Sequence, residues 1–406
     1  MAQRLLATLA VALASFGACA QQAYPDVAFS GFGTLGLVQT DTNAGQYATS
    51  VLQPLGADKG LDWRTDSLIA GQVNARFTRS LSIVAQVVAN ETADHDFMPH
   101  FEWAFARYAI TPDLAVRGGI MAVPVFMLSD SRLVGISFPW VRPPTAVYSQ
   151  APITNFRGAD LTYRTAFGET SFTVQPYFGE APTDVPLNAG GVVRSHLDRV
   201  AGLGVRAERG PWSARVGWFQ SRFTYRSPTT QALATSLHDA AAALPGTLGL
   251  ANDISSIDKR LTFASVGVAC DGERAFFQAE YGRRKSETFL ASTDAWYATL
   301  GYRFGNVMPH VTVSGVDVTS RTRQDVIPAS GPFAPLAASV NSLLSGQNVK
   351  QDTVAVGVRW QFSKNADLKL QWDHVHLPDG AVGNFHGTPG FADSVNVYSA
   401  AMDFVF

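Results

Sequence analysis

The stretch Tyr398-Ser399-Ala400-Ala401-Met402-Asp403-Phe404-Val405-Phe406 ends the chain and alternates between two kinds of residue. Every second residue from Tyr398 to Phe406 is apolar or aromatic, so these side chains share one face of a β-strand. At the edge of a soluble sandwich, such an apolar strand would promote aggregation. In a closed barrel it is paired on both sides. The stretch therefore favours a closed β-barrel.

The same period of two recurs along the chain between short runs of turn-forming residues. It predicts 16 strands, at residues 27–38, 66–77, 81–90, 101–110, 114–121, 156–165, 170–179, 200–208, 212–225, 260–270, 274–285, 294–304, 309–318, 352–362, 368–375 and 393–406. Most of these segments have the length of about 9–11 residues that a transmembrane β-strand needs.

The connections between the predicted strands alternate in length. Seven short turns alternate with eight longer segments, at 39–65, 91–100, 122–155, 180–199, 226–259, 286–293, 319–351 and 376–392. Barrels of the bacterial outer membrane have short turns at the periplasmic rim and long loops outside. The sequence therefore predicts an all-β fold: a transmembrane antiparallel β-barrel of 16 strands over residues 21–406, with short periplasmic turns and long extracellular loops.

The first twenty residues have the pattern of a secretory signal peptide. Arg4 precedes an uncharged apolar run at 5–15, and Ala18-Cys19-Ala20 is a small-residue cleavage site. A lipoprotein-type site at Cys19 is the weaker interpretation, because Phe16 stands where an aliphatic residue is expected. Cleavage after Ala20 would leave Cys270 as the single cysteine, without an intrachain partner.

Composition narrows the classes of function. Charged residues make up 16% of the chain and its net charge is −2, which argues against nucleic acid as a partner. Aromatic residues gather beside the short turns, as in the aromatic girdle of a barrel. They are Phe77, Tyr163, Trp212, Tyr302, Phe304, Trp360, Phe362, Phe404 and Phe406.

Three motifs carry a resemblance to a known family: Phe29-Ser30-Gly31-Phe32-Gly33, Asp113-Leu114-Ala115-Val116-Arg117-Gly118-Gly119 and the final Phe404-Val405-Phe406. With the strand pattern, they resemble the general porins of the Gram-negative outer membrane. The resemblance implies a homotrimer of 16-stranded barrels, located in the outer membrane in contact with lipid and lipopolysaccharide. It also implies that the third long connection, 122–155, folds inward as a constriction loop. Its Pro-rich run Trp140-Val141-Arg142-Pro143-Pro144 departs from the acidic, Gly-rich loop typical of the family.

Residues opposite the apolar faces would line the pore. Basic residues predicted there are Arg76, Arg107, Arg117, Arg164, Arg206, Arg215, Arg284, Arg303, Arg359 and Lys369, with Asp130 and Arg132 added from the constriction loop. The wall acids predicted by the same rule are Asp160, Glu208, Glu280, Asp373 and Asp403. Arg107 belongs to the set only if Trp103 and Phe105 also point inward. An excess of arginine would favour anions, but Arg–acid pairs could cancel it, and both interpretations stay open.

These observations predict a water-filled channel for passive diffusion of small hydrophilic solutes and ions, and a mild preference for anions is one of the two open interpretations of its wall charges. A substrate-specific porin and a plugged structural or adhesive barrel are the alternatives. No enzymatic activity and no cofactor are expected, because the sequence lacks a Gly-x-Ser-x-Gly motif. No metal site is expected either, since His374 and His376 alone are weak evidence for one. Two loop segments, 229–244 and 333–344, are helix-prone and are expected to cover the outer mouth.

Overall fold

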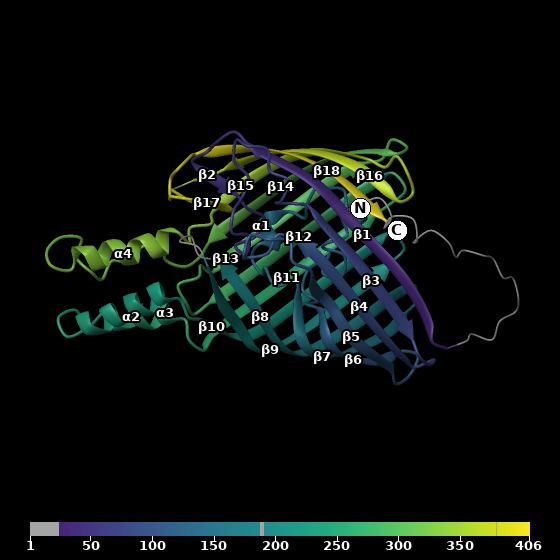
Figure 1. The fold of residues 1–406 in the computed structure, drawn as a ribbon, viewed down its shortest axis with the longest axis horizontal. Coiled ribbons are helices and arrows are strands. Elements are labelled where there is room, and N and C mark those ends of the chain that lie inside the picture. Colours follow the sequence, from purple (N-terminus) through teal and green to yellow (C-terminus); the bar gives the residue numbers. More distant parts are fainter. Residues whose placement is uncertain (1–23, 187–190, 379) are drawn as a thin grey trace, which may run out of the picture.

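The computed structural model describes residues 24–186, 191–378 and 380–406, and the expected signal peptide at 1–20 lies outside them. The chain forms a closed barrel of 16 antiparallel strands, in which the first strand pairs with the last (Figure 1). All 16 predicted strands are confirmed. They are β1 (Asp26–Thr40), β3 (Leu68–Arg76), β4 (Leu81–Asn90), β5 (His100–Ala109), β6 (Leu114–Ala122), β7 (Asn155–Phe167), β8 (Thr170–Pro186), β9 (Val192–Arg209), β10 (Trp212–Tyr225), β11 (Lys259–Asp271), β12 (Ala275–Ser286), β13 (Thr293–Tyr302), β14 (Val307–Val318), β15 (Gln351–Trp360), β16 (Ala366–His376) and β18 (Ser394–Val405).

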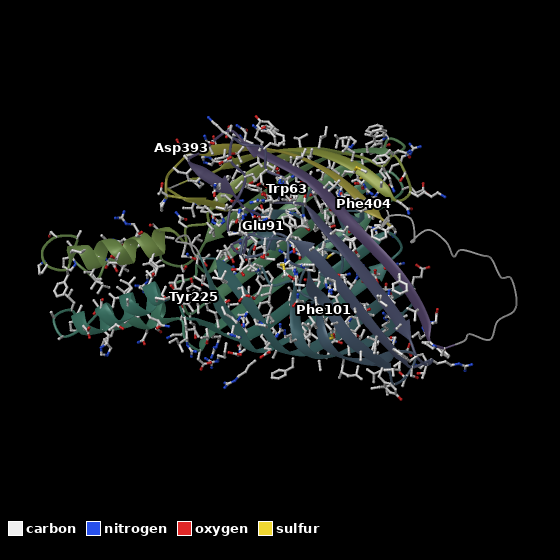
Figure 2. The ribbon with its side chains drawn as sticks, viewed as in Figure 1. Trp63, Glu91, Phe101, Tyr225, Asp393 and Phe404 are labelled. Carbon is white, nitrogen blue, oxygen red and sulfur yellow. The ribbon has the colours of Figure 1, made fainter. Side chains whose placement is uncertain are left out.

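The outer face of the barrel is apolar. Phe29, Leu300 and Phe406 are exposed there, and the girdle aromatics Trp212 and Trp360 are exposed at the short-turn ends of their strands. Figure 2 labels two further aromatic residues of the barrel wall, Phe101 and Phe404. A closed barrel pairs all of its backbone groups, and an outer face of this kind is stable only in lipid. The barrel therefore spans a membrane.

The largest departures from the predicted strand lengths are in β8 and β9. The hairpin of β8 and β9 continues through 180–186 and 192–199, where the sequence pattern predicted a loop. A register shift between Gly179 and Ala181 interrupts the side-chain alternation that the sequence pattern depends on. A separate two-stranded sheet, β2 (Gly45–Tyr47) with β17 (Phe385–Gly387), also joins two long loops.

Three helices lie in two of the long loops, 226–258 and 319–350. The two predicted ones are confirmed as α2 (Pro228–Ala240) and α4 (Ala334–Ser345), and α3 (Thr247–Ser255) follows α2. They project away from the rim (Figure 1), so the expectation that they cover the mouth is wrong. The reason is that their apolar faces pack on one another, through Leu237, Ile254 and Val340. None of the described helices is long and apolar enough to cross a membrane.

Residues 123–154, called the inward loop below, connect β6 to β7 and fold into the barrel. They contain the 3₁₀ turn η1 (Gly135–Ser137) and the short helix α1 (Thr145–Tyr148). Phe126, Trp140 and Tyr148 of this loop are buried in one apolar cluster with wall residues Phe263 and Tyr297. The interior is thus partly filled by the chain's own loop.

Candidate pore and its inward loop

Polar side chains of the wall hold the inward loop in place. The Trp140 indole Nε1 donates to Thr299 and Thr312 Oγ1, at 3.0 and 2.9 Å. Lys369 Nζ donates to the Gly135 carbonyl at 2.7 Å, and Arg359 donates to the Ile136 carbonyl at 2.9 Å; these two interactions involve β16 and β15.

The first part of the loop is bonded to β10 and β12. Arg215 of β10 donates to the Phe126 carbonyl at 2.9 Å and to Asp130 at 3.1 Å. Glu280 of β12 accepts hydrogen bonds from the Met127 amide at 3.0 Å and from the Tyr148 hydroxyl at 3.1 Å. These bonds satisfy loop backbone groups that would otherwise be buried without partners.

The loop also reaches the strands at both ends of the chain. Arg142 donates through Nε to Asp66 at 2.8 Å and through Nη2 to Ser399 of β18 at 2.7 Å. Leu133 and Val134 pack against an apolar patch made by Phe32, Ala70 and Val88, on β1, β3 and β4. The loop therefore crosses the whole interior.

The strand register puts every predicted basic wall residue on the inner face, including Arg107, which lies opposite Arg117. Four of them contact the inward loop: Arg215, Arg284, Arg359 and Lys369. Arg132 of the loop donates to the Tyr148 carbonyl at 3.0 Å and lies over the Phe126 and Tyr148 rings. Asp130 is half exposed. These contacts show that much of the predicted basic wall supports the loop.

Three further basic residues form ion pairs on the wall: Arg117 with Asp160 at 2.6 Å, Arg206 with Glu208 at 2.8 Å, and Arg303 with Asp271 at 2.5 Å. Charge in these pairs is largely cancelled locally. The predicted acids Asp403 and Asp373 are also paired, with Lys369 and Arg142 respectively.

The remaining three, Arg76, Arg107 and Arg164, have no carboxylate within 4.0 Å among residues 24–186, 191–378 and 380–406. Arg76 lies opposite Ser82, and Ser82 lies opposite Arg107. On its other side Arg107 lies opposite Arg117. These arginines lie toward the short-turn rim and are called the basic vestibule below.

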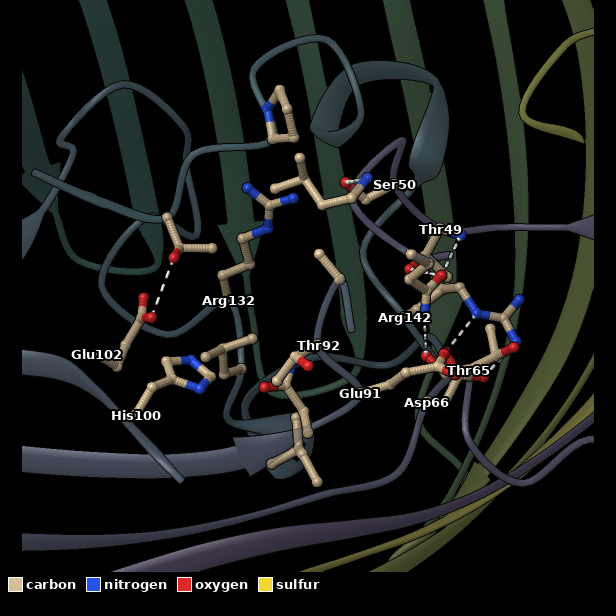
Figure 3. A pocket seen from close by; sticks show the side chains of 18 of the residues that line it. Thr49, Ser50, Thr65, Asp66, Glu91, Thr92, His100, Glu102, Arg132 and Arg142 are labelled. Atoms are coloured by element: carbon tan, nitrogen blue, oxygen red, sulfur yellow. Dashed lines mark hydrogen bonds and ion pairs between the residues drawn. The ribbon is translucent and has the colours of Figure 1, made fainter. Parts of the chain in front are cut away.

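A cavity of about 550 Å³ lies on the long-loop side of the inward loop (Figure 3). It is called the outer cavity below. Segments 49–53, 64–68 and 90–102 line one side, and inward-loop residues between 132 and 154 line the other. Within it, Arg142 is paired with Asp66, and this pair joins two of the lining segments.

Two buried carboxylates of the outer cavity, Glu91 and Glu102, were not among the predicted pore residues. Glu91 directly follows β4, and Glu102 lies at a register shift where β5 pairs with β4. At the shift, Glu102 and its neighbour Trp103 both face the interior. A strict alternation of faces therefore could not identify Glu102 as an inward-facing residue.

No protein-family model matches the sequence, and a search of curated proteins finds no match. Solved structures do match the fold. They include OmpT, an outer membrane protein of Vibrio cholerae, in trimer form (15% identity, 94% of this chain and 99% of that chain, TM-score 0.55). They also include an anion-selective porin from Comamonas acidovorans (12% identity, 94% of this chain and 99% of that chain, TM-score 0.56). A third is the outer membrane channel DcaP of Acinetobacter baumannii (11% identity, 97% of this chain and 100% of that chain, TM-score 0.53).

At identities of 11–15% these matches concern the fold alone. They cover nearly the whole of this chain, and they agree with the closed 16-stranded barrel and its apolar outer face. The chain has the fold of the Gram-negative outer-membrane porins.

Proposed function

We propose that the protein is a porin of the outer membrane that lets small hydrophilic solutes and ions diffuse passively. The observation that carries the proposal is the inner wall, whose polar side chains hold a loop across the interior. An outer cavity lies on one side of this loop, and the basic vestibule lies toward the short-turn rim. Passive diffusion needs no further chemistry, and the proposal includes no cofactor and no catalytic activity.

A mild anion preference is part of the proposal, and it rests on the basic vestibule. Arg76, Arg107 and Arg164 have no carboxylate within 4.0 Å in the described chain, although Asp26 lies opposite Arg76 in the strand register. Unpaired arginines beside a water-filled passage attract anions. The similar porin from Comamonas acidovorans is described as anion-selective, which supports the same direction here.

Single-channel recording of the mature protein in a planar bilayer tests the proposal. We expect discrete conductance steps and, in a salt gradient, a reversal potential of the sign for anions. Steps in groups of three would support the homotrimer, for which the trimer form of a similar structure is the present support. A folded barrel without steps would contradict the channel and favour a plugged structural or adhesive barrel.

A substrate-specific channel is a second candidate, favoured by the number of bonds that fix the inward loop. A rigid loop presents the same groups to every solute, which suits recognition of one of them. Saturable block of the current by one solute, with no block by others of equal size, would distinguish this candidate from a general pore.

A further inference from the structure

A second, smaller cavity lies at the short-turn ends of β1, β3, β4 and β5, on the side of the molecule away from the three helices (Figure 1). Its volume is about 270 Å³, and it is called the rim cavity below. The turn between β3 and β4 lines it through Thr78, Arg79 and Ser80. Arg76 and Arg107 of the basic vestibule line it as well, so two arginines of the vestibule share one cavity.

The strand register brings Arg76, Ser82 and Arg107 into one row across the wall. Arg76 of β3 lies opposite Ser82 of β4, and Ser82 lies opposite Arg107 of β5. Directly opposite residues of an antiparallel pair have Cβ atoms about 5 Å apart. Ser82 therefore has one arginine on each side, and both arginine side chains are long enough to turn toward a group held over the Ser82 hydroxyl.

The donors of this row are free. Among the described residues, Arg76 and Arg107 donate no side-chain hydrogen bond and form no ion pair, and Ser82 Oγ has no hydrogen-bond partner. On its other side Arg107 lies opposite Arg117, which is paired with Asp160. Like charges directly opposite each other in a sheet are unfavourable. An anion bound between Arg76 and Arg107 would offset this repulsion.

The number and kind of these donors favour a phosphate group over a carboxylate or a halide. Guanidinium groups donate in a fork that matches oxyanions. A phosphate monoester has three terminal oxygens and a charge of about −1.5 to −2 at pH 7. Arg76, Arg107 and the Ser82 hydroxyl supply one donor group for each oxygen. A carboxylate would leave one of the three groups without an acceptor, and chloride carries a single charge.

Asp26 is the one acid among the described residues that line the rim cavity. It lies opposite Arg76 in the register of β1 and β3, but it forms no ion pair within 4.0 Å in the part of the chain that the structure describes. A carboxylate accepts hydrogen bonds and repels a second anion. Asp26 therefore suits a hydroxyl group of a ligand and not its phosphate.

We propose that the rim cavity binds small phosphate monoesters that carry hydroxyl groups. Arg76, Ser82 and Arg107 hold the phosphate, and a ligand hydroxyl donates to Asp26. The volume of about 270 Å³ is just below the range of about 300–1,000 Å³ for drug-sized ligands, so the ligand is small. The inference rests on the proposed function, because it extends the anion preference to one class of solute. Occupancy of the site does not require an open pore, since the cavity lies at the rim.

The test is equilibrium binding of glycerol 3-phosphate to the folded full-length barrel in detergent, by titration calorimetry at low ionic strength. At pH 8 the ester is a dianion, because its second pKa is about 6. We expect one saturable site, no binding of glycerol and weaker binding of inorganic phosphate. Arg76→Gln and Arg107→Gln should each weaken the affinity about tenfold or more, because a charge-assisted hydrogen bond is replaced by a neutral one.

Two further variants make the test specific. Arg274→Gln, in the short turn between β11 and β12, removes the same charge elsewhere on the rim and should bind like the unaltered protein. Asp26→Ala should reduce the preference for glycerol 3-phosphate over inorganic phosphate. Both ligands are relieved of the same repulsion in this variant, and only the ester loses an acceptor for its hydroxyl.

Absence of saturable binding to a barrel of native heat-modifiable mobility would overturn the proposal. Equal weakening by Arg274→Gln would also overturn it, because only the overall charge would then matter. Equal affinity for inorganic phosphate would overturn the assigned ligand class. Binding without conductance would keep this site and reject the channel, and conductance without binding would do the reverse.

Discussion

Lys369 is a fully buried cation on the inner wall. Its exposed fraction is 1%, and it pairs with Asp403 at 2.8 Å while donating to the Gly135 carbonyl. Lys369→Met would leave the equally buried Asp403 without its cation. Removing one partner of a buried pair costs about 3–5 kcal/mol. We therefore expect a lower denaturant midpoint for the variant.

The measurement is urea unfolding in lipid vesicles, with Arg79→Met at an exposed short turn as the control. The double variant Lys369→Met, Asp403→Asn should recover part of the lost stability, because no lone charge remains. If Lys369→Met is as stable as the parent, the ion pair of Lys369 and Asp403 makes no net contribution to the stability of the barrel.

Glu91 predicts a pH dependence at the long-loop side. Burial raises its pKa above the ordinary 4.5; the His95 hydrogen bond opposes this, with smaller effects from Asp62, which raises it, and Arg64, which lowers it. Between 4.5 and the higher folded pKa, the folded protein therefore binds the extra proton. The stability that Glu91 contributes is present below 4.5 and is lost as pH rises through the folded pKa.

Comparing the unfolding free energy of the parent and Glu91→Gln across pH 4–8 measures this effect. The difference between the two should change in that window, with the parent losing stability relative to the variant as pH rises. A difference that is flat with pH would contradict this expectation.

The inward loop gives predictions at the scale of an element. Trp140→Phe keeps an aromatic ring in the apolar cluster but loses the donor to Thr299 and Thr312. Loss of these bonds should loosen the loop, and we expect greater open-channel current noise with the barrel intact. Trp212→Phe, on the outer girdle, is the control that makes the same chemical change away from the loop. Equal noise in the two variants would contradict a role for the Trp140 bonds.

The strands could be predicted from the sequence because each has two chemically different faces. The alternation of apolar and polar residues is a local property of the sequence. It is present wherever one face of a strand contacts lipid. It fails at β8, where a register shift and the prolines of 181–186 hide a continuing strand. It also fails at Glu102, which lies at the shift between β4 and β5. These failures mark the points where pairing with a distant segment decides the geometry.

The partners of the wall arginines could not be predicted at all. Arg215 and Arg359 were expected to face the lumen, and their side of the strand follows from alternation. Their bonds to Phe126 and Ile136 depend on how the inward loop folds, which is a long-range property. Sequence alone therefore identifies the inner face and leaves open which of its charges are available to a solute.

At the scale of the whole molecule, the basic vestibule decides the expected selectivity. Replacing Arg107 and Arg164 by Ser removes two of its three charges without leaving a paired acid behind. We expect the reversal potential in a salt gradient to shift toward that of a cation-preferring channel. Arg209→Ser, at an exposed turn where Arg209 pairs with Glu169, is the control. An unchanged potential in the double variant would show that the vestibule does not determine ion preference.

The contacts of the inward loop also determine when the pore can take its final form during folding. The loop lies between β6 and β7, yet Arg142 is bonded to Ser399 and Gly135 lies against Lys369 and Asp403, near the end of the chain. Ser399 and Asp403 lie on β18, the strand that pairs with β1 and closes the wall. We therefore expect these contacts of the inward loop to form only after the last strand has joined the wall. A chain halted before its last strand pairs would have a partly assembled wall around an unanchored loop, and the dimensions of its opening would differ from those of the finished protein.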